Sequence, residues 1–179
     1  MTLSHSAESS ADASPNAIVD PQVLAGLPHR GSMLLIDRIL DRTPETIVCE
    51  KTFREGEFFF DGHFPNRPIV PGVIQCECCL QAGALLLAAQ PKPSNDRSAP
   101  SEGGSVSGGS DDSASRPVLP VATRMDAVKL KKMIGPGDRV EISVTLKERV
   151  SNAYYMTGKM TLDGKLTARL DFTCSLVSS

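Results

Sequence analysis

The longest apolar stretch of the chain runs from Gly72 to Ala89 and shows no alternation of polar and apolar residues. It is too long for a strand, and Pro71-Gly72 at its start is typical of the first turn of a helix. At a rise of about 1.5 Å per residue, such a helix measures roughly 27 Å. Its strongly polar side chains are confined to Gln75, Glu77 and Gln81. The pattern therefore predicts a helix that other structure encloses on nearly all sides.

This apolar helix is close to the length of about 20 residues that a membrane span requires. Three observations count against a span: the carboxylate of Glu77, the two glutamines, and the lack of aromatic or basic anchors beside the helix. We therefore expect no membrane span and interpret the helix as the centre of a folded domain.

Alternating segments on both sides of the helix predict a sheet. A short helix is expected first, from Asp20-Pro21 to about Leu27, because Asp20 can cap it and Pro21 suits its first position. Asp163-Gly164 is a strong signal for a type I′ hairpin turn. The predicted strands are Met33–Arg42, Glu45–Phe53, Pro117–Leu130, Asp138–Val150, Ala153–Leu162 and Lys165–Val177. The fold class is therefore α+β, with an antiparallel β-sheet wrapped around a long central helix, and its edges and apolar face predict a dimer.

Two segments have compositions that do not support a packed core. Residues 1–17 are polar without periodicity, which predicts a disordered leader. Residues 91–117 consist mostly of Ser, Gly and Pro, which predicts a flexible surface insertion. The domain is thus expected to span residues 18–179 and to carry this insertion between the helix and the next strand.

Composition excludes several classes of function. The 179 residues are enough for one domain, and a net charge of −2 offers no basic field for nucleic acid. The N-terminus has no apolar segment typical of a secretory signal. Five cysteines, three of them at Cys76, Cys78 and Cys79, form no disulfide framework and indicate a reducing, cytoplasmic location. Since no second Cys/His pair exists, we interpret these thiols as packing groups and expect no metal site.

The chemistry is expected from one pair of residues. His63 lies in the loop before the helix, and Glu77 follows fourteen residues later, one turn into the helix. Three phenylalanines, Phe58 to Phe60, precede the histidine and could wall an apolar pocket around it. Alternatively, the histidine could cap a turn, and the glutamate could belong to a structural ion pair. Together they form a candidate acid/base pair.

Several short motifs occur in the order and at the spacing of one known family. They are Leu27-Pro28-His29-Arg30, Leu35-Ile36-Asp37-Arg38, Gly62-His63-Phe64-Pro65, Pro68-Ile69-Val70-Pro71-Gly72-Val73, Glu77 with Gln81, and Pro136-Gly137-Asp138. The chain resembles the (3R)-hydroxyacyl-[acyl carrier protein] dehydratases of FabZ type, which have the hot-dog fold. The resemblance covers about residues 20–90 and 117–177. The chain departs from the family pattern at Gln75 and the neighbouring cysteines, at Asn66-Arg67, and in the insertion.

The resemblance implies which residues act and how the chains assemble. It makes His63 the catalytic histidine and Glu77 the catalytic acid, and a glutamate at position 77 favours simple dehydration over dehydration with isomerisation. It implies a homodimer or trimer of dimers whose active site combines the histidine of one chain with the glutamate of the other. The groups expected to bind the thioester oxygen and the substrate are Gly72, Val73, Phe64 and Gln81.

The reaction explains why these residue types are needed. Loss of water from a β-hydroxyacyl thioester requires a base for the α-proton, an acid for the departing hydroxyl, and a donor to the enolate-like oxygen. A histidine, with a reference pKa of about 6.5, can take the proton near neutrality, and a protonated glutamate can release the hydroxyl as water. Gly72 would offer an unpaired N–H at the helix N-terminus. A water-mediated sharing of the two roles is equally compatible with the sequence.

The substrate implied by the resemblance arrives as a thioester on the phosphopantetheine of acyl carrier protein, with no other cofactor. An acidic carrier requires a basic docking surface. The densest cationic group of the sequence consists of Arg124, Lys129, Lys131, Lys132 and Arg139. A solvated strand edge would explain the same residues.

Two other functions are compatible with the predicted fold. A hot-dog thioesterase would also use a carboxylate and a helix N-terminus but would release a free thiol, and the Gly-His-Phe-Pro loop counts against it. A non-catalytic acyl-binding module would have no need for intact His63 and Glu77. The sequence leaves open the acyl chain length, the pathway (fatty acid, lipid A or secondary metabolite) and the choice between dimer and hexamer.

Deleting residues 92–116 and joining the ends with a short Gly/Ser linker should leave folding and dehydration largely intact, because the segment has little to pack. Melting temperature and turnover of a 3-hydroxyacyl carrier protein measure the two effects. A large fall in melting temperature, or lost activity in a folded variant, would show that the insertion has a function of its own.

Overall fold

The computed structural model describes residues 19–90 and 118–178. The predicted leader at 1–17 and the predicted insertion at 91–117 lie outside the described residues.

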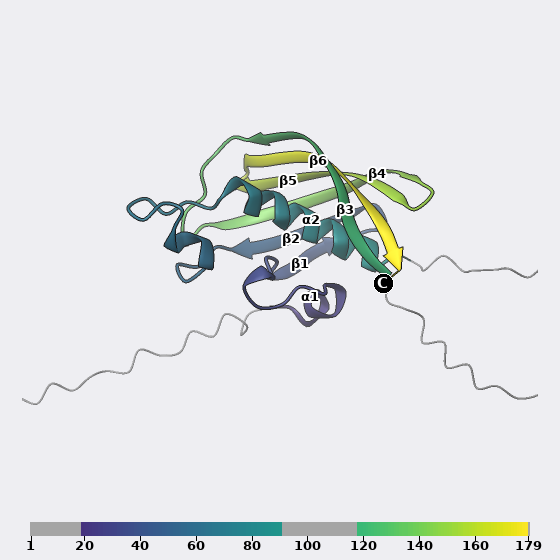
Figure 1. Cartoon of the computed structure of the whole chain (residues 1–179), viewed down its shortest axis with the longest axis horizontal. Helices are drawn as coiled ribbons and strands as arrows, with labels where there is room; N and C mark the ends of the chain where they lie inside the picture. Colours follow the sequence, from purple (N-terminus) through teal and green to yellow (C-terminus); the bar gives the residue numbers. More distant parts are fainter. Residues whose placement is uncertain (1–18, 91–117, 179) are drawn as a thin grey trace, which may run out of the picture.

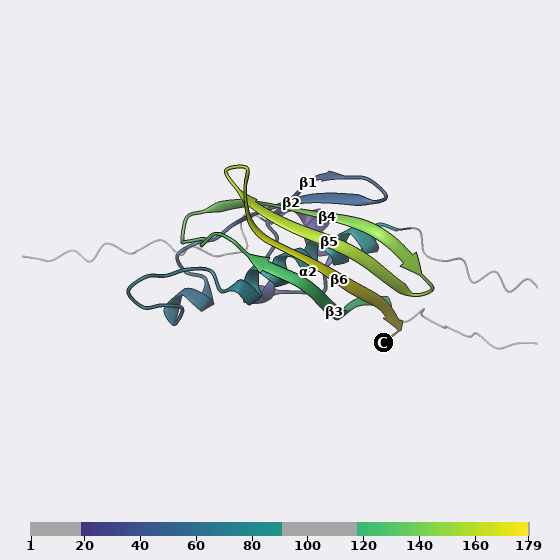
Figure 2. The ribbon, with the colours of Figure 1, turned by 90° about the horizontal axis from the view of Figure 1, so that it is seen from above.

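One sheet and one long helix make up most of the described chain (Figure 1). In chain order the elements are α1 (Pro21–Gly26), the 3₁₀ turn η1 (Gly31–Met33), β1 (Arg38–Arg42), β2 (Thr46–Thr52), the 3₁₀ turn η2 (Phe58–Asp61), α2 (Gly72–Ala88), β3 (Val118–Leu130), β4 (Arg139–Val150), β5 (Ala153–Leu162) and β6 (Lys165–Ser178). All neighbouring strands pair antiparallel, in the order β1-β2-β4-β5-β6-β3. Helix α2 packs against β2, β3, β4, β5 and β6, so the curved sheet wraps it as predicted (Figure 2).

Helix α2 is buried because its apolar residues point in every direction. Side chains from Ile74 to Leu87 lie in the core, which also takes in residues from every strand of the described sheet except its two edge strands, β1 and β3. Two glycines allow the helix and the sheet to approach closely. A Cβ on Gly158 of β5 would lie 2.8 Å from the Cβ of Cys79, and one on Gly83 of α2 would lie 2.8 Å from the ring of Phe172. Both distances are too short for a real Cβ, so this packing requires glycine at both positions.

The cysteines are packed inside the domain. All five are free and buried, and Cys79 contacts Gly158 directly. Burial raises the pKa of the Cys79 thiol well above its ordinary range and raises that of Cys174 to about 11. A buried thiol of this kind is a small apolar group with little thiolate to react. Within residues 19–90 and 118–178, no three His, Cys, Asp or Glu side chains are placed to hold a metal ion.

The predicted elements differ from the structure mainly before β1. The strand expected from Met33 begins only at Arg38, because Met33 and Leu35 bond to Gln81 of α2 and the first bond to β2 is made by the N–H of Asp37 to the carbonyl of Glu50. The side chains of Leu34, Leu35 and Ile36 are all buried, which is incompatible with the alternation of a half-exposed strand. The Asp163-Gly164 turn is confirmed, with φ of 53° and 72°, both in the region that a type I′ turn needs.

Helix α2 has 17 residues, and no helix in the part of the chain that the structure describes combines the length and the apolar character needed to cross a bilayer.

Gly158→Ala should lower the free energy of unfolding by about 1–3 kcal/mol, because the new methyl group overlaps Cys79. Denaturant unfolding measures the change. Gly56→Ala is the matched control, since a Cβ there meets no atom within 4 Å and the expected change is below about 0.5 kcal/mol. Equal effects of the two variants would contradict the close helix–sheet contact.

Candidate active site

His63 is held in one orientation by the loop that leads into α2. Its N–H donates to the carbonyl of Phe59 over 3.1 Å, and its carbonyl accepts from the N–H of Ile69 over 2.9 Å. The imidazole Nδ1 lies 3.0 Å from the carbonyl oxygen of Ile69. A carbonyl only accepts hydrogen bonds, so this contact assigns the hydrogen of the neutral ring to Nδ1. The Nε2 lone pair is then available to take a proton.

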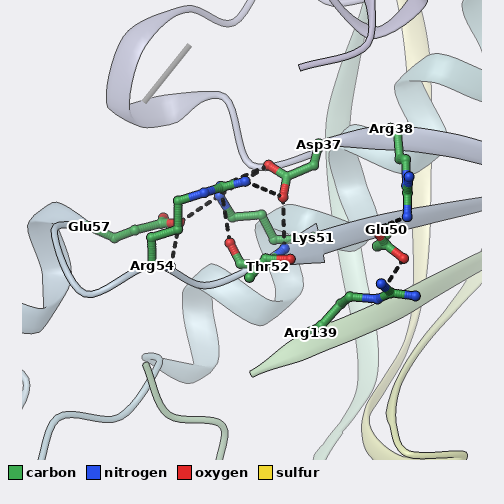
Figure 3. A network of polar contacts seen from close by, with 8 residues as sticks. All are labelled: Asp37, Arg38, Glu50, Lys51, Thr52, Arg54, Glu57 and Arg139. Carbon is green, nitrogen blue, oxygen red and sulfur yellow. Dashed lines mark hydrogen bonds and ion pairs between the residues drawn. The ribbon is translucent and has the colours of Figure 1, made fainter. Parts of the chain in front are cut away.

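A buried ionic network anchors the start of this loop (Figure 3). The Lys51 ammonium, with 4% of its side chain exposed, lies 2.6 Å from a carboxylate oxygen of Glu57, the residue before η2. Arg54 reaches both carboxylate oxygens of Asp37 at 3.1 Å, and Lys51 lies 3.7 Å from the same carboxylate. These bonds fix Glu57, and thereby the turn η2 whose Phe59 carbonyl binds the backbone of His63.

The aromatic ring beside the imidazole is that of Phe64. The two rings are stacked with centroids 4.3 Å apart and planes inclined by 25°. Phe59 and Phe60 are buried in the core and pack edge-to-face on each other, and a pocket wall from Phe58 to Phe60 stays a prediction. Phe64 itself is more than half exposed, and its contact with a substrate also stays a prediction.

The N-terminus of α2 presents two free N–H donors, of which the sequence analysis had expected that of Gly72. The carbonyl of Pro71 accepts from the N–H groups of Ile74 and Gln75, whereas those of Gly72 and Val73 donate to none of the described residues. Val73 is 75% exposed. The end of the Leu130 side chain on β3 occupies the place that a Cβ of Gly72 would need, so a larger residue here would have to displace it.

Glu77 is less buried than its apolar helix suggests, since 25% of its side chain is exposed. Its Oε1 accepts a hydrogen bond of 2.9 Å from Nε2 of Gln81 and lies 3.5 Å from Nε2 of His29. Its Oε2 takes part in no hydrogen bond or ion pair with the described part of the chain. One carboxylate oxygen is thus held by the protein, and the other is left for a ligand.

Gln81 is the residue that orients Glu77. Only 1% of it is exposed, and its amide also accepts from the N–H of Leu35 over 2.9 Å and donates to the carbonyl of Met33 over 2.7 Å. Direct contact between Gln81 and a substrate, as the sequence suggested, stays a prediction, and this geometry counts against it. The contact of His29 with Glu77 escaped the sequence analysis, where His29 stood only as one letter of the Leu-Pro-His-Arg motif.

His63 and Glu77 do not contact each other within one chain. Neither an ion pair nor a hydrogen bond joins them in residues 19–90 and 118–178. An acid/base pair built from these two groups therefore needs a substrate between them or a second copy of the chain.

The five cationic residues predicted to dock a carrier protein differ in whether an acidic side chain pairs with their charge. Arg124 lies 2.6 Å from Asp126, and Arg139 lies 2.8 Å from Glu50, so both are paired inside the chain (Figure 3 shows Arg139). Lys129, Lys131 and Lys132 are exposed and form no ion pair with the described residues. Among these five residues, the positive charge without an ion-pair partner in the described chain therefore lies at the end of β3 and directly after it.

Comparison with known proteins defines the fold and then the family. The dehydratase heterocomplex ApeI:P from Xenorhabdus doucetiae superposes with a TM-score of 0.65 at 16% identity, over 88% of this chain and 91% of that one. Zebra fish thioesterase superfamily member 2 superposes with a TM-score of 0.58 at 14% identity, over 87% of this chain and 92% of that one. These likenesses, together with the sheet wrapped around α2, identify the hot-dog fold.

Sequence similarity is more specific. A family model described as a FabA-like domain matches residues 27–107. The 3-hydroxyacyl-[acyl-carrier-protein] dehydratase FabZ of Oleidesulfovibrio alaskensis is 34% identical over 158 residues, which is 88% of this chain and 90% of that protein. The FabZ of Streptococcus pneumoniae is 35% identical over 148 residues, 82% of this chain and 89% of that protein. The chain belongs to the FabZ family of 3-hydroxyacyl-[acyl-carrier-protein] dehydratases and is accordingly a hydro-lyase.

Proposed function

We propose that the chain removes water from (3R)-3-hydroxyacyl groups carried on acyl carrier protein, giving trans-2-enoyl carrier protein in fatty acid or lipid biosynthesis. The observation that carries the proposal is that one side chain has a nitrogen free to accept a proton and the other has a carboxylate oxygen without a partner. The hydrogen bond at Nδ1 of His63 leaves Nε2 as a base, and Glu77 keeps Oε2 free of partners in the described chain. Membership of the FabZ family indicates the substrate on which these two groups act, a 3-hydroxyacyl group on acyl carrier protein.

In this proposal each site group has one task. Nε2 of His63 takes the proton from C2 of the acyl chain, and the electron pair forms the C2–C3 double bond. The C3–O bond breaks, and the hydroxyl leaves as water with the proton of Glu77. Negative charge that builds on the thioester oxygen meets the free N–H of Gly72 at the positive end of α2. A water that passes protons between the two side chains would use the same positions.

We propose further that a working site combines His63 of one chain with Glu77 of its partner, in a homodimer or a trimer of dimers. Their lack of contact within one chain supports this arrangement. So does the edge strand β3, which has an unpaired side and exposes apolar side chains beside Gly72. These are Val121, Met125, Val128 and Leu130. A second chain that pairs with β3 would cover them and would reach the N-terminus of α2.

Lys129, Lys131 and Lys132 are the cations best placed to receive an acidic carrier protein. They have no internal partner among the described residues, and they flank Leu130, which lies on Gly72. The phosphopantetheine arm would then lead toward the proposed thioester site. The five free thiols support a cytoplasmic location.

The test of the function is incubation of the purified protein with 3-hydroxyacyl carrier proteins of several chain lengths. Mass spectrometry should find loss of one water from the acyl group without release of the carrier thiol. Thiol release without dehydration would identify a thioesterase, and an inactive folded protein would identify an acyl-binding module.

Glu77→Gln should lower the dehydration rate by about 10²-fold or more, because an amide has no proton to give the leaving hydroxyl. The free energy of unfolding should change by less than about 1 kcal/mol, since the amide oxygen can still accept from Gln81. Single-turnover kinetics and denaturant unfolding measure the two quantities. Near wild-type turnover would remove Glu77 from the mechanism.

Mixing the inactive variants His63→Ala and Glu77→Ala under conditions that exchange subunits should restore activity. A hybrid dimer has one site that lacks both groups and one site with both intact. Random exchange makes about half of the dimers hybrid, so activity should approach roughly a quarter of the wild-type value. If native mass spectrometry confirms exchange while activity stays at the background of the single variants, each site lies within one chain.

A further inference from the structure

His29 is a titratable side chain at the proposed active site for which the mechanism so far has no use. Its Nε2 lies 3.5 Å from Oε1 of Glu77, on the oxygen that Gln81 also binds. Its Nδ1 is buried and has no hydrogen-bond partner among the described residues. Of the two ring nitrogens of His29, only Nε2 therefore has a polar partner in the described chain, and that partner is Glu77.

The backbone around His29 is built to hold this contact. The Arg30 guanidinium donates to the carbonyl oxygens of Leu27, His29 and Leu24 at 2.5, 2.6 and 3.0 Å, which ties the turn after α1. Gly26 lets α1 approach α2, because a Cβ there would lie 2.7 Å from the side chain of Leu85. The segment that carries His29 is thus pressed against the helix that carries Glu77.

The surroundings of the ring assign its tautomer. A hydrogen on Nδ1 would be a buried donor with no acceptor in the described chain, while a bare Nε2 would direct its lone pair at a carboxylate oxygen. With the hydrogen of the neutral ring on Nε2, that nitrogen faces an acceptor, and the buried Nδ1 is left as an unpaired acceptor and not as an unpaired donor. His29 is then a second N–H donor to Oε1, beside the amide of Gln81.

We propose that His29 is a positioning residue for Glu77. Together with Gln81 it keeps Oε1 of Glu77 as a hydrogen-bond acceptor, so that Oε2 is the oxygen that carries the proton to the substrate. A proton on Oε1 would face two donors, so the acidic hydrogen is placed on Oε2. The distance of 3.5 Å is at the outer limit of a hydrogen bond, and the proposal requires it to shorten when substrate binds. The proposal rests on the proposed role of Glu77 as the acid.

Replacement of His29 tests the proposal through kcat. His29→Ala should lower kcat about tenfold, as expected for loss of one donor to a charged group, and should leave KM within about twofold. His29→Gln should recover most of kcat, because its amide can place an N–H near the position of Nε2. His29→Asn should behave like His29→Ala, because the shorter amide reaches only the position of Nδ1.

A double-mutant cycle separates positioning from general stability. In the Glu77→Gln background, His29→Ala should reduce the residual single-turnover rate by less than twofold, since the acid that it orients is gone. Asp20→Ala is the matched control in the same segment: it removes the cap of α1, a hydrogen bond of 2.8 Å to Gln22, without touching Glu77. It should lower the melting temperature and leave kcat unchanged.

The outcomes are distinguishable. Four results would each overturn the proposal for His29. The first two are a wild-type kcat in His29→Ala and an effect of that variant on KM alone. The others are a tenfold loss of rate that persists in the Glu77→Gln background and a kcat that His29→Gln does not restore. If Glu77→Gln itself keeps wild-type activity, the proposed acid is wrong and the role of His29 fails with it. If the alanine variant does not fold, the comparison of His29→Gln with His29→Asn gives the same decision.

Discussion

The structure depends on covering a helix that is apolar on nearly every side. Helix α2 has no face suited to water along most of its length, so a single sheet must curve around it. The fit is tight because Gly83 and Gly158 remove the side chains that would hold helix and sheet apart. Helix α2 reaches the surface at Val73 in its first turn and at Ala88 at its end, and between them Glu77 keeps a partly exposed carboxylate.

At Gln81 and at Asp37, polar groups in this interior are held by several bonds, whereas the buried Oε1 of Gln75 has no partner among the described residues. The Gln81 amide is almost fully buried, and each of its atoms is used, toward Leu35, Met33 and Glu77. Asp37, two residues after Leu35, accepts hydrogen bonds from Arg54 and Thr52, and its carboxylate lies near the ammonium of Lys51. The same short segment between α1 and β1 therefore links the helix of Glu77 with the loop of His63.

Many elements could be predicted from local pattern. The central helix and the last two strands have nearly the predicted bounds, because long apolar periodicity and the Asp163-Gly164 turn are local signals. Residues 33–37 were predicted as the start of a strand because the segment from Met33 to Arg42 alternates, yet Leu34, Leu35 and Ile36 are buried in succession as an irregular segment against a helix. The partners of that segment lie more than forty residues away in sequence, so no local pattern could reveal them.

The sequence by itself predicted the fold class and the enclosed helix, and it marked His63 and Glu77 as a candidate acid/base pair whose chemistry suits dehydration. It did so because side-chain period, turn residues and motif spacing are properties of neighbouring positions. Only the tertiary structure decided which ring stacks on His63, which tautomer it has, and that Gln81 and His29 share one oxygen of Glu77. The contact between His29 and Glu77 joins residues 48 positions apart, and the others depend on side-chain orientations within the loop before α2 and along α2 that no sequence pattern specifies.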